Sequence, residues 1–158
     1  MKYIHHYESP LGAMTMSSDG ESLGELWFGD CRENEYEEKI LPVFEETVKW
    51  LDIYFGGNIP DFTPVLSVQT TEFRKKVCDI MLTIPYGKTM TYGEIANVIA
   101  KQLGMKQMSA QAVGGAVGHN PIALIIPCHR VMGANGKLTG YAAGVDRKEK
   151  LLKLEGII

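Results

Sequence analysis

A cysteine and a histidine stand side by side in Pro127-Cys128-His129-Arg130-Val131, directly after an apolar run over residues 122–126. The thiolate of cysteine is a strong soft nucleophile, and a neighbouring imidazole is a possible base. The apolar run predicts a buried strand, in which consecutive side chains point to opposite faces. Cooperation between Cys128 and His129 therefore needs a bend or a bridging water. A buried cysteine that only packs in the core is the alternative.

The other cysteines give little support to a metal or disulfide site. Cys31, Cys78 and Cys128 are widely spaced, and no Cys-x-x-Cys pair occurs, so neither a disulfide framework nor a thiolate zinc site is indicated. His5, His6 and Cys31 could form part of a metal site, but no fourth ligand is evident. We expect no metal and no cofactor.

Length and composition fit one large domain or two small ones, since 158 residues with 45% hydrophobic content can build a proper core. No apolar stretch reaches the length of a membrane span, and the first residues lack the apolar region of a secretory signal. The expectation is a soluble, cytoplasmic protein that acts as a monomer.

The net charge of −3 conceals a division along the chain. Residues 1–69 carry four basic and thirteen acidic side chains, whereas residues 70–158 carry twelve basic and six acidic ones. The C-terminal part could therefore face a polyanion such as DNA. Alternatively, the two parts attract each other and the lysines only solvate helix surfaces.

The first part of the chain predicts a small αβ domain. Residues 1–30 alternate apolar and polar between turn signals, which is typical of an antiparallel meander. A helix is predicted from Pro42 to a stop at Gly56-Gly57. Pro60 and Pro64 mark a linker, so we predict domains over residues 1–66 and 67–158.

The second part predicts mostly helices. Thr70 or Thr71 caps the first, which runs to a turn at residues 85–88. Thr91 and Glu94 form a capping box for the next, which Gly104 closes. Ser109 caps a short helix of small residues over 110–118, which gives a helix-turn-helix candidate. Its glycines predict close approach of a partner to the backbone, or else tight packing on a core.

The end of the chain predicts a final strand, turn and helix. After the strand at 122–126, residues 133–136 supply turn chemistry. An acidic capping box over residues 146–149 then opens a terminal helix that continues through Leu154.

Six blocks in this order resemble the O6-alkylguanine-DNA alkyltransferase family. They are Ile84-Pro85-Tyr86-Gly87-Lys88-Thr89, Thr91-Tyr92-Gly93-Glu94-Ile95-Ala96, Val113-Gly114-Gly115-Ala116, Asn120-Pro121, Ile126-Pro127-Cys128-His129-Arg130-Val131 and Gly140-Tyr141. The resemblance is dense over about residues 70–156. It implies an α+β fold with a small N-terminal antiparallel-sheet (ribonuclease H-like) domain, followed by a mostly helical winged helix-turn-helix DNA-binding domain.

The implied activity is DNA repair. The family moves the alkyl group of O6-alkylguanine, and less efficiently that of O4-alkylthymine, irreversibly onto its own cysteine, here Cys128. It binds double-stranded DNA through the minor groove and rotates the damaged nucleotide out of the stack.

The resemblance also assigns roles by residue. His129 activates Cys128 through a water and Glu155 orients the imidazole, while Tyr92 donates a proton to guanine N3. The implied substrate-binding residues are Asn120, Val131, Tyr141 and Ala142. The implied DNA-binding residues are Gln111, Ala112, Gly114, Gly115 and Arg130.

Three positions depart from the family pattern. Many members have arginine where Gln111 stands, and glutamine has neither a charge nor a guanidinium plane to stack. Glycine is usual at Ala143, and an added methyl group can narrow the pocket. Cys78 replaces a common tryptophan.

Three other functions remain open from the sequence. A lesion binder without repair activity would lack Cys128. A winged-helix transcription regulator would use Cys128 structurally or as a redox sensor. A cysteine hydrolase would need partners that His5, His6 and His119 do not suggest.

Overall fold

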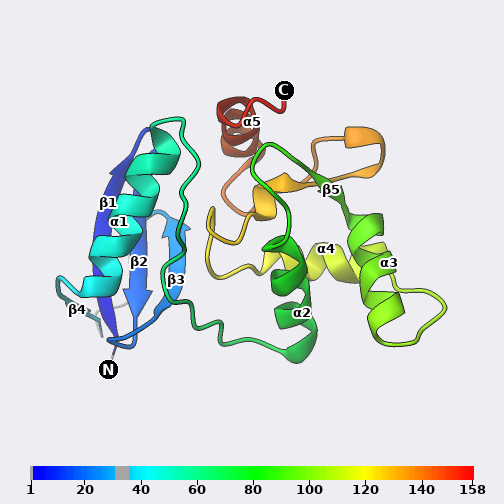
Figure 1. Cartoon of the computed structure of the whole chain (residues 1–158), viewed down its shortest axis with the longest axis horizontal. Coiled ribbons are helices and arrows are strands. Elements are labelled where there is room, and N and C mark those ends of the chain that lie inside the picture. The colour runs from blue at the N-terminus through cyan, green and yellow to red at the C-terminus, as the bar shows by residue number, and fades with distance from the viewer. Residues whose placement is uncertain (1, 31–35) are drawn as a thin grey trace. The chain divides into compact units, whose positions relative to one another are not determined.

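The computed structural model describes residues 2–30 and 36–158, and the chain in it divides into two compact units. The first contains residues 1–69 and 121–123, and the second contains residues 70–120 and 124–158. Figure 1 labels helices and strands of both units. Among the described residues, no helix is long and apolar enough to cross a membrane.

The first unit contains a four-stranded sheet in the order β3-β2-β1-β4. Strands β1 (Tyr3–Ser9), β2 (Gly12–Ser18) and β3 (Leu23–Phe28) form the predicted antiparallel meander, and β4 (Glu37–Glu38) pairs parallel to β1. Gly12 begins β2 directly after the tight turn and has a φ of +123°, a conformation that glycine adopts readily.

Helix α1 (Pro42–Phe55) lies against this sheet and confirms the predicted helix. It buries Phe44, Leu51 and Tyr54, while the sheet buries Met14 and Met16. The ring of His5 stacks on Phe44 with centroids 5.9 Å apart, so this histidine packs against the helix.

Residues 121–123 belong to the first unit because they bond to the edge of its sheet. The Leu26 amide donates to the Pro121 carbonyl at 2.9 Å, and the Ala123 amide donates to the Leu26 carbonyl at 2.9 Å. Ile122 between them is fully buried.

The second unit is mostly helical, with α2 (Glu72–Met81), α3 (Tyr92–Gln102), α4 (Ala110–Gly118) and α5 (Val145–Leu154). Strands β5 (Met90–Thr91) and β6 (Val131–Met132) pair in parallel, and Cys128–Arg130 and Ala134–Gly136 are short 3₁₀ helices. Thr71, one of the two predicted candidates, caps α2, and Ser109 caps α4 as predicted. Both bonds of the Thr91–Glu94 capping box are present.

Two local predictions were wrong. Residues 123–126 form turns instead of a strand, and Leu124 has a φ of +69°. A continuous apolar run is compatible with any buried conformation, and burial is the part of the prediction that holds. Helix α5 begins after Gly144, with no side-chain cap, so Asp146 lies inside the first turn and does not cap the helix.

Candidate active site

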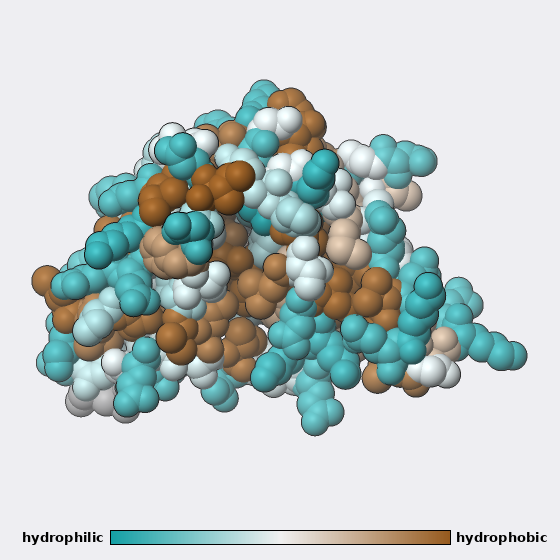
Figure 2. Space-filling view, viewed as in Figure 1, coloured by the Kyte–Doolittle hydropathy of each residue, from teal (hydrophilic) through white to brown (hydrophobic). Residues whose placement is uncertain are grey.

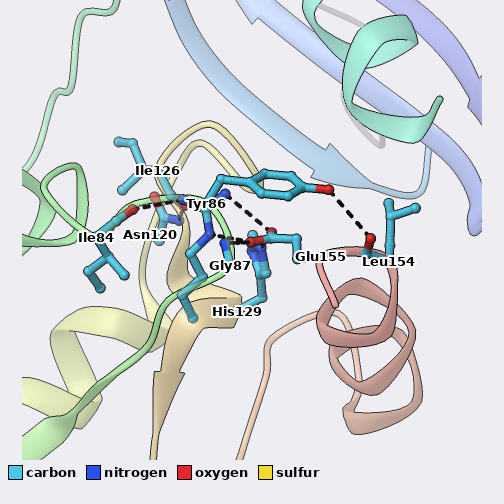
Figure 3. Close-up of polar contacts among 9 residues, drawn as sticks. Ile84, Tyr86, Gly87, Asn120, Ile126, His129, Leu154 and Glu155 are labelled. Carbon is cyan, nitrogen blue, oxygen red and sulfur yellow. Dashed lines mark hydrogen bonds and ion pairs between the residues drawn. The ribbon is translucent and has the colours of Figure 1, made fainter. Parts of the chain in front are cut away.

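The proposed nucleophile lies on a 3₁₀ turn. The Cys128 amide donates to the Ile126 carbonyl at 2.8 Å and the Arg130 amide to the Pro127 carbonyl at 3.0 Å. Three residues per turn direct consecutive side chains about 120° apart, so Cys128 and His129 are not held on opposite faces. The Asn120 side chain donates to the Ile126 carbonyl at 2.8 Å (Figure 3) and holds the preceding segment.

The Cys128 thiol is protonated at rest. Its side chain is almost fully buried, and this burial raises the pKa of the thiol above its ordinary value. Asn120, the charge of Lys148 and the Tyr141 hydroxyl oppose the effect and favour the thiolate. A base must therefore remove the proton during the reaction.

A buried histidine-carboxylate pair lies next to the thiol in sequence. His129 Nε2 donates to Glu155 Oε2 at 2.5 Å, and both side chains are fully buried. Burial lowers the pKa of His129, although the bond to Glu155 opposes this. The imidazole is therefore neutral at pH 7 and able to accept a proton.

Glu155 is held as a carboxylate by several donors. Burial by itself raises the pKa of Glu155, but the contacts from His129, Arg130 and the Gly87 amide outweigh it and bring the pKa to about 2. The Gly87 amide donates at 3.0 Å. Figure 3 shows that the turn over 86–87 and the end of α5 meet at this carboxylate.

Arg130 lies in the interior, whereas the resemblance implied that it contacts DNA. Its Nε donates to Glu155 Oε1 at 2.8 Å and one terminal nitrogen donates to the Ile84 carbonyl at 2.8 Å. Only 9% of its side chain is exposed. The guanidinium binds the carboxylate of Glu155, and this placement argues against the DNA-binding role that the resemblance implied.

Lys148 is a site residue that the sequence reasoning missed. It is fully buried, and its ammonium donates to the Val131 carbonyl at 2.6 Å and to the Thr139 carbonyl at 2.9 Å. Burial lowers the pKa of Lys148, and the nearby Cys128 opposes this. Lysines are almost never fully buried without partners, so its type predicted a surface position. Helical periodicity was the available signal, because Lys148 lies three and four residues before the buried Leu151 and Leu152.

Of the remaining substrate-binding candidates, only some lie close to Cys128. The Tyr141 hydroxyl is buried and interacts with the Cys128 thiol. The Val131 carbonyl already accepts from Lys148. Ala142 follows Tyr141 and is exposed.

The N-terminus of α4 opens on a hollow of about 620 Å³. Tyr92, Gln111, Gly114 and the loop residues Gly133 and Thr139 are among those that line it. The predicted acid at Tyr92 and the predicted DNA-binding residue Gln111 therefore share one surface, and Ala112 beside it is exposed.

The glycines of α4 are not required for internal packing. A Cβ added at Gly115 or Gly118 would meet no atom within 4 Å, and one at Gly114 would touch the Tyr92 ring at an ordinary 3.8 Å. Because glycine weakens a helix, their presence favours a partner that approaches the α4 backbone over tight packing on a core.

No metal centre emerges from the described parts of the chain, since no group of three or more His, Cys, Asp or Glu side chains could hold an ion there. His6 contacts Thr15, with Nδ1 and Oγ1 3.4 Å apart. Cys31, the third member of the candidate metal set, lies outside the described residues.

Two family models match the chain. The first, described as 6-O-methylguanine DNA methyltransferase, ribonuclease-like domain, matches residues 2–68. The second, described as 6-O-methylguanine DNA methyltransferase, DNA binding domain, matches residues 72–157. They confirm the predicted fold class, an α+β chain with a ribonuclease-like domain before a helical DNA-binding domain.

Relatives with a named activity match over nearly the whole length. A methylated-DNA–protein-cysteine methyltransferase of Methanosarcina acetivorans is 45% identical over 162 residues, with 98% of each chain covered. One of Mycobacterium bovis is 43% identical over 156 residues, covering 95% of this chain and 92% of the relative.

Solved structures of Mycobacterium tuberculosis proteins have the same fold. Its O6-methylguanine methyltransferase superposes with a TM-score of 0.84 at 41% identity, covering 98% of this chain and 93% of that one. The structure titled OGT in complex with DNA gives a TM-score of 0.83 at 42% identity, covering 97% and 92%.

Proposed function

The chain belongs to the 6-O-methylguanine DNA methyltransferase family, and we propose on that basis that it repairs O6-alkylguanine in double-stranded DNA by transferring the alkyl group to Cys128. The observation that carries the proposal is the buried pair of His129 and Glu155, whose histidine directly follows a buried, protonated thiol in the sequence. O4-alkylthymine is the proposed poorer substrate.

Access requires base flipping, because a base stacked in a duplex cannot reach a buried sulfur. The exposed backbone of α4 at Gly115 and the side chains of Gln111 and Ala112 approach the minor groove. Gln111 takes the place of the extruded nucleotide in the stack. One copy of the chain is sufficient, because every residue named in the relay lies in the second unit.

The transfer begins with a proton shift. The Cys128 thiol passes its proton through a water to Nδ1 of His129, whose Nε2 is already bonded to Glu155. The carboxylate of Glu155 stabilises the imidazolium that forms. The resulting thiolate attacks the saturated carbon of the alkyl group in an SN2 displacement.

The bond from O6 to the alkyl carbon breaks as the sulfur-carbon bond forms. As the guanine leaves, Tyr92 donates a proton to its N3, so the base departs neutral. The proton held by His129 then returns through water to the Tyr92 phenolate, and both side chains end uncharged. The Ala142 amide donates to O6, and the carbonyls of Cys128 and Val131 accept from the exocyclic amine. Cys128 ends as a thioether that no residue can reverse, so each molecule acts once.

The test is a stoichiometric transfer assay with duplex DNA that contains one O6-methylguanine. We expect one methyl group per protein, found by mass spectrometry on the peptide that contains Cys128. Cys128→Ala should bind the duplex with unchanged affinity and transfer nothing. Cys78→Ala, which removes the other described buried cysteine, is the matched control and should retain transfer. A methyl group on another residue, or on none, contradicts the proposal.

A further inference from the structure

One long stretch of the chain is free of acidic residues. No aspartate or glutamate occurs between Glu94 and Asp146, although the whole sequence contains 19. The stretch includes α4, the turn before it and the loop that lines the hollow beside Tyr92. Basic residues without neighbouring acidic ones are the electrostatic signature of a surface that binds nucleic acid.

Few cations of this stretch are available to a phosphate. Arg130 is committed to Glu155. The three that remain are exposed lysines, and none of them takes part in an ion pair within the described residues. They are Lys101, Lys106 and Lys137.

The turn that carries Lys106 is unusually long for a helix-turn-helix. Helix α3 ends at Gln102 and α4 begins at Ala110, so residues 103–109 separate two helices that a turn of about three or four residues usually joins. All of them except Met108 are exposed. In Figure 1 this turn extends away from α3 at the right of the view, and hydrophilic side chains reach into solvent at the same place in Figure 2.

The start of the turn has a fixed conformation. The Met105 amide donates to the Ala100 carbonyl at 2.8 Å and the Gly104 amide to the Lys101 carbonyl at 3.3 Å. Gly104 has a φ of +65°. This is a Schellman motif, so the backbone that leads to Lys106 is ordered by the end of α3.

The end of the turn is fixed by α4. Ser109 caps this helix by accepting from the Ala112 amide at 3.2 Å. Lys106 precedes Gln111 by five residues, which limits the distance between their Cα atoms to about 17 Å. Phosphates follow one another every ~3.4 Å along the axis of each strand, so Lys106 is within reach of a phosphate near the nucleotide that Gln111 displaces.

We propose that the turn 103–109 is a second DNA contact, in which Lys106 binds a backbone phosphate of the duplex that α4 engages. The turn supplies near α4 a positive charge that Gln111 does not supply. The inference rests on the proposed function for the identity of the partner, and it adds a contact outside the hollow beside Tyr92.

The test measures binding of undamaged duplex DNA by fluorescence anisotropy between about 0.05 and 0.2 M salt. Loss of one phosphate contact makes the slope of log K against log salt shallower by about 0.9. We expect this change for Lys106→Ala, with a fall in affinity of about five-fold near 0.15 M salt. Lys106→Arg should keep the slope of the unmodified protein.

Lys150→Ala is the matched control, since it removes the same charge from an exposed position on α5. The inference is overturned if Lys106→Ala and Lys150→Ala have the same slope. Methyl transfer by Lys150→Ala at saturating DNA is measured in parallel and should equal that of the unmodified protein. Failure of transfer in the unmodified protein and in every variant would count against the proposed function alone. Normal transfer by the unmodified protein, with an unchanged salt slope for Lys106→Ala, would count against the contact of the turn 103–109 alone.

Discussion

At the scale of single residues, the neighbours Cys128 and His129 have opposite pKa shifts with the same cause. Burial raises the pKa of the thiol from its ordinary 9.0 and lowers the pKa of the imidazole from its ordinary 6.5. Each group is therefore held in its uncharged form. Before substrate binds, the sulfur of Cys128 is protonated and one ring nitrogen of His129 is unprotonated.

These shifts predict the pH dependence of transfer. His129 must be neutral to accept the proton, and its lowered pKa keeps it neutral above pH 6.5. The single-turnover rate should stay level from about pH 9 down to about pH 6.5 and fall only below that. Rapid-quench measurements on methylated duplex would show this.

One control variant and one contradicting outcome accompany this prediction. His6→Gln changes an exposed histidine of the first unit and should leave the profile unchanged. A rate that rises tenfold per pH unit between pH 7 and 8.5 would mean that the thiol loses its proton to solvent before the reaction. That result would contradict proton transfer to His129.

Gln111 is a second single residue with a predicted effect, because its side chain fills the space that the flipped base leaves. Gln111→Arg adds a charge and a planar group that stacks, so we expect tighter duplex binding and faster transfer at limiting protein, each by several-fold. Gln111→Lys adds the charge without the plane and should improve binding more than transfer. Equal rates for all three proteins would show that another residue assists flipping.

At the scale of elements, Glu155 joins the end of α5 to the turn after α2 and to the 3₁₀ helix of Cys128. Arg130 completes this junction through the Ile84 carbonyl. Removing one partner of a buried ion pair typically costs about 3–5 kcal/mol. Arg130→Met should therefore lower the free energy of unfolding by about that amount, as measured by urea denaturation.

The same variant separates a structural arginine from a DNA contact. Arg130→Met should retain the salt dependence of duplex binding under conditions where it is folded. Arg130→Lys keeps the charge but loses the paired geometry and should recover only part of the stability. A shallower salt slope for Arg130→Met would restore the role that the sequence resemblance implied.

Elements also show which features local sequence could predict. The caps at Thr71, Thr91 and Ser109 depend on residues within three positions of one another, and all were predicted. The conformation of residues 123–126 depends on distant packing, and leucine gives no signal for the positive φ of Leu124. The burial of Lys148 depends on two carbonyls that the chain brings together only after folding.

At the scale of the whole molecule, the order of the two domains followed from the sequence, while their boundary at residue 67 stays a prediction. The family models leave residues 69–71 between them. The thiol and a possible base followed from the residues alone, and the resemblance added the carboxylate and the water between them. The contact of Arg130 with Glu155 and the burial of both side chains required the three-dimensional structure.

The place of residues 121–123 restricts how the molecule can be re-engineered. The chain leaves the second unit after Asn120, adds three residues to the sheet of the first, and returns at Leu124 just ahead of the reactive segment. Neither unit is a single uninterrupted cassette. A chimera that takes residues 1–69 from a relative must also take that relative's counterpart of Ile122. Otherwise the buried Ile122 will pack against a sheet edge of different sequence. Ile122 lies only six residues before the acceptor Cys128, so such a mismatch would fall close to the reactive segment.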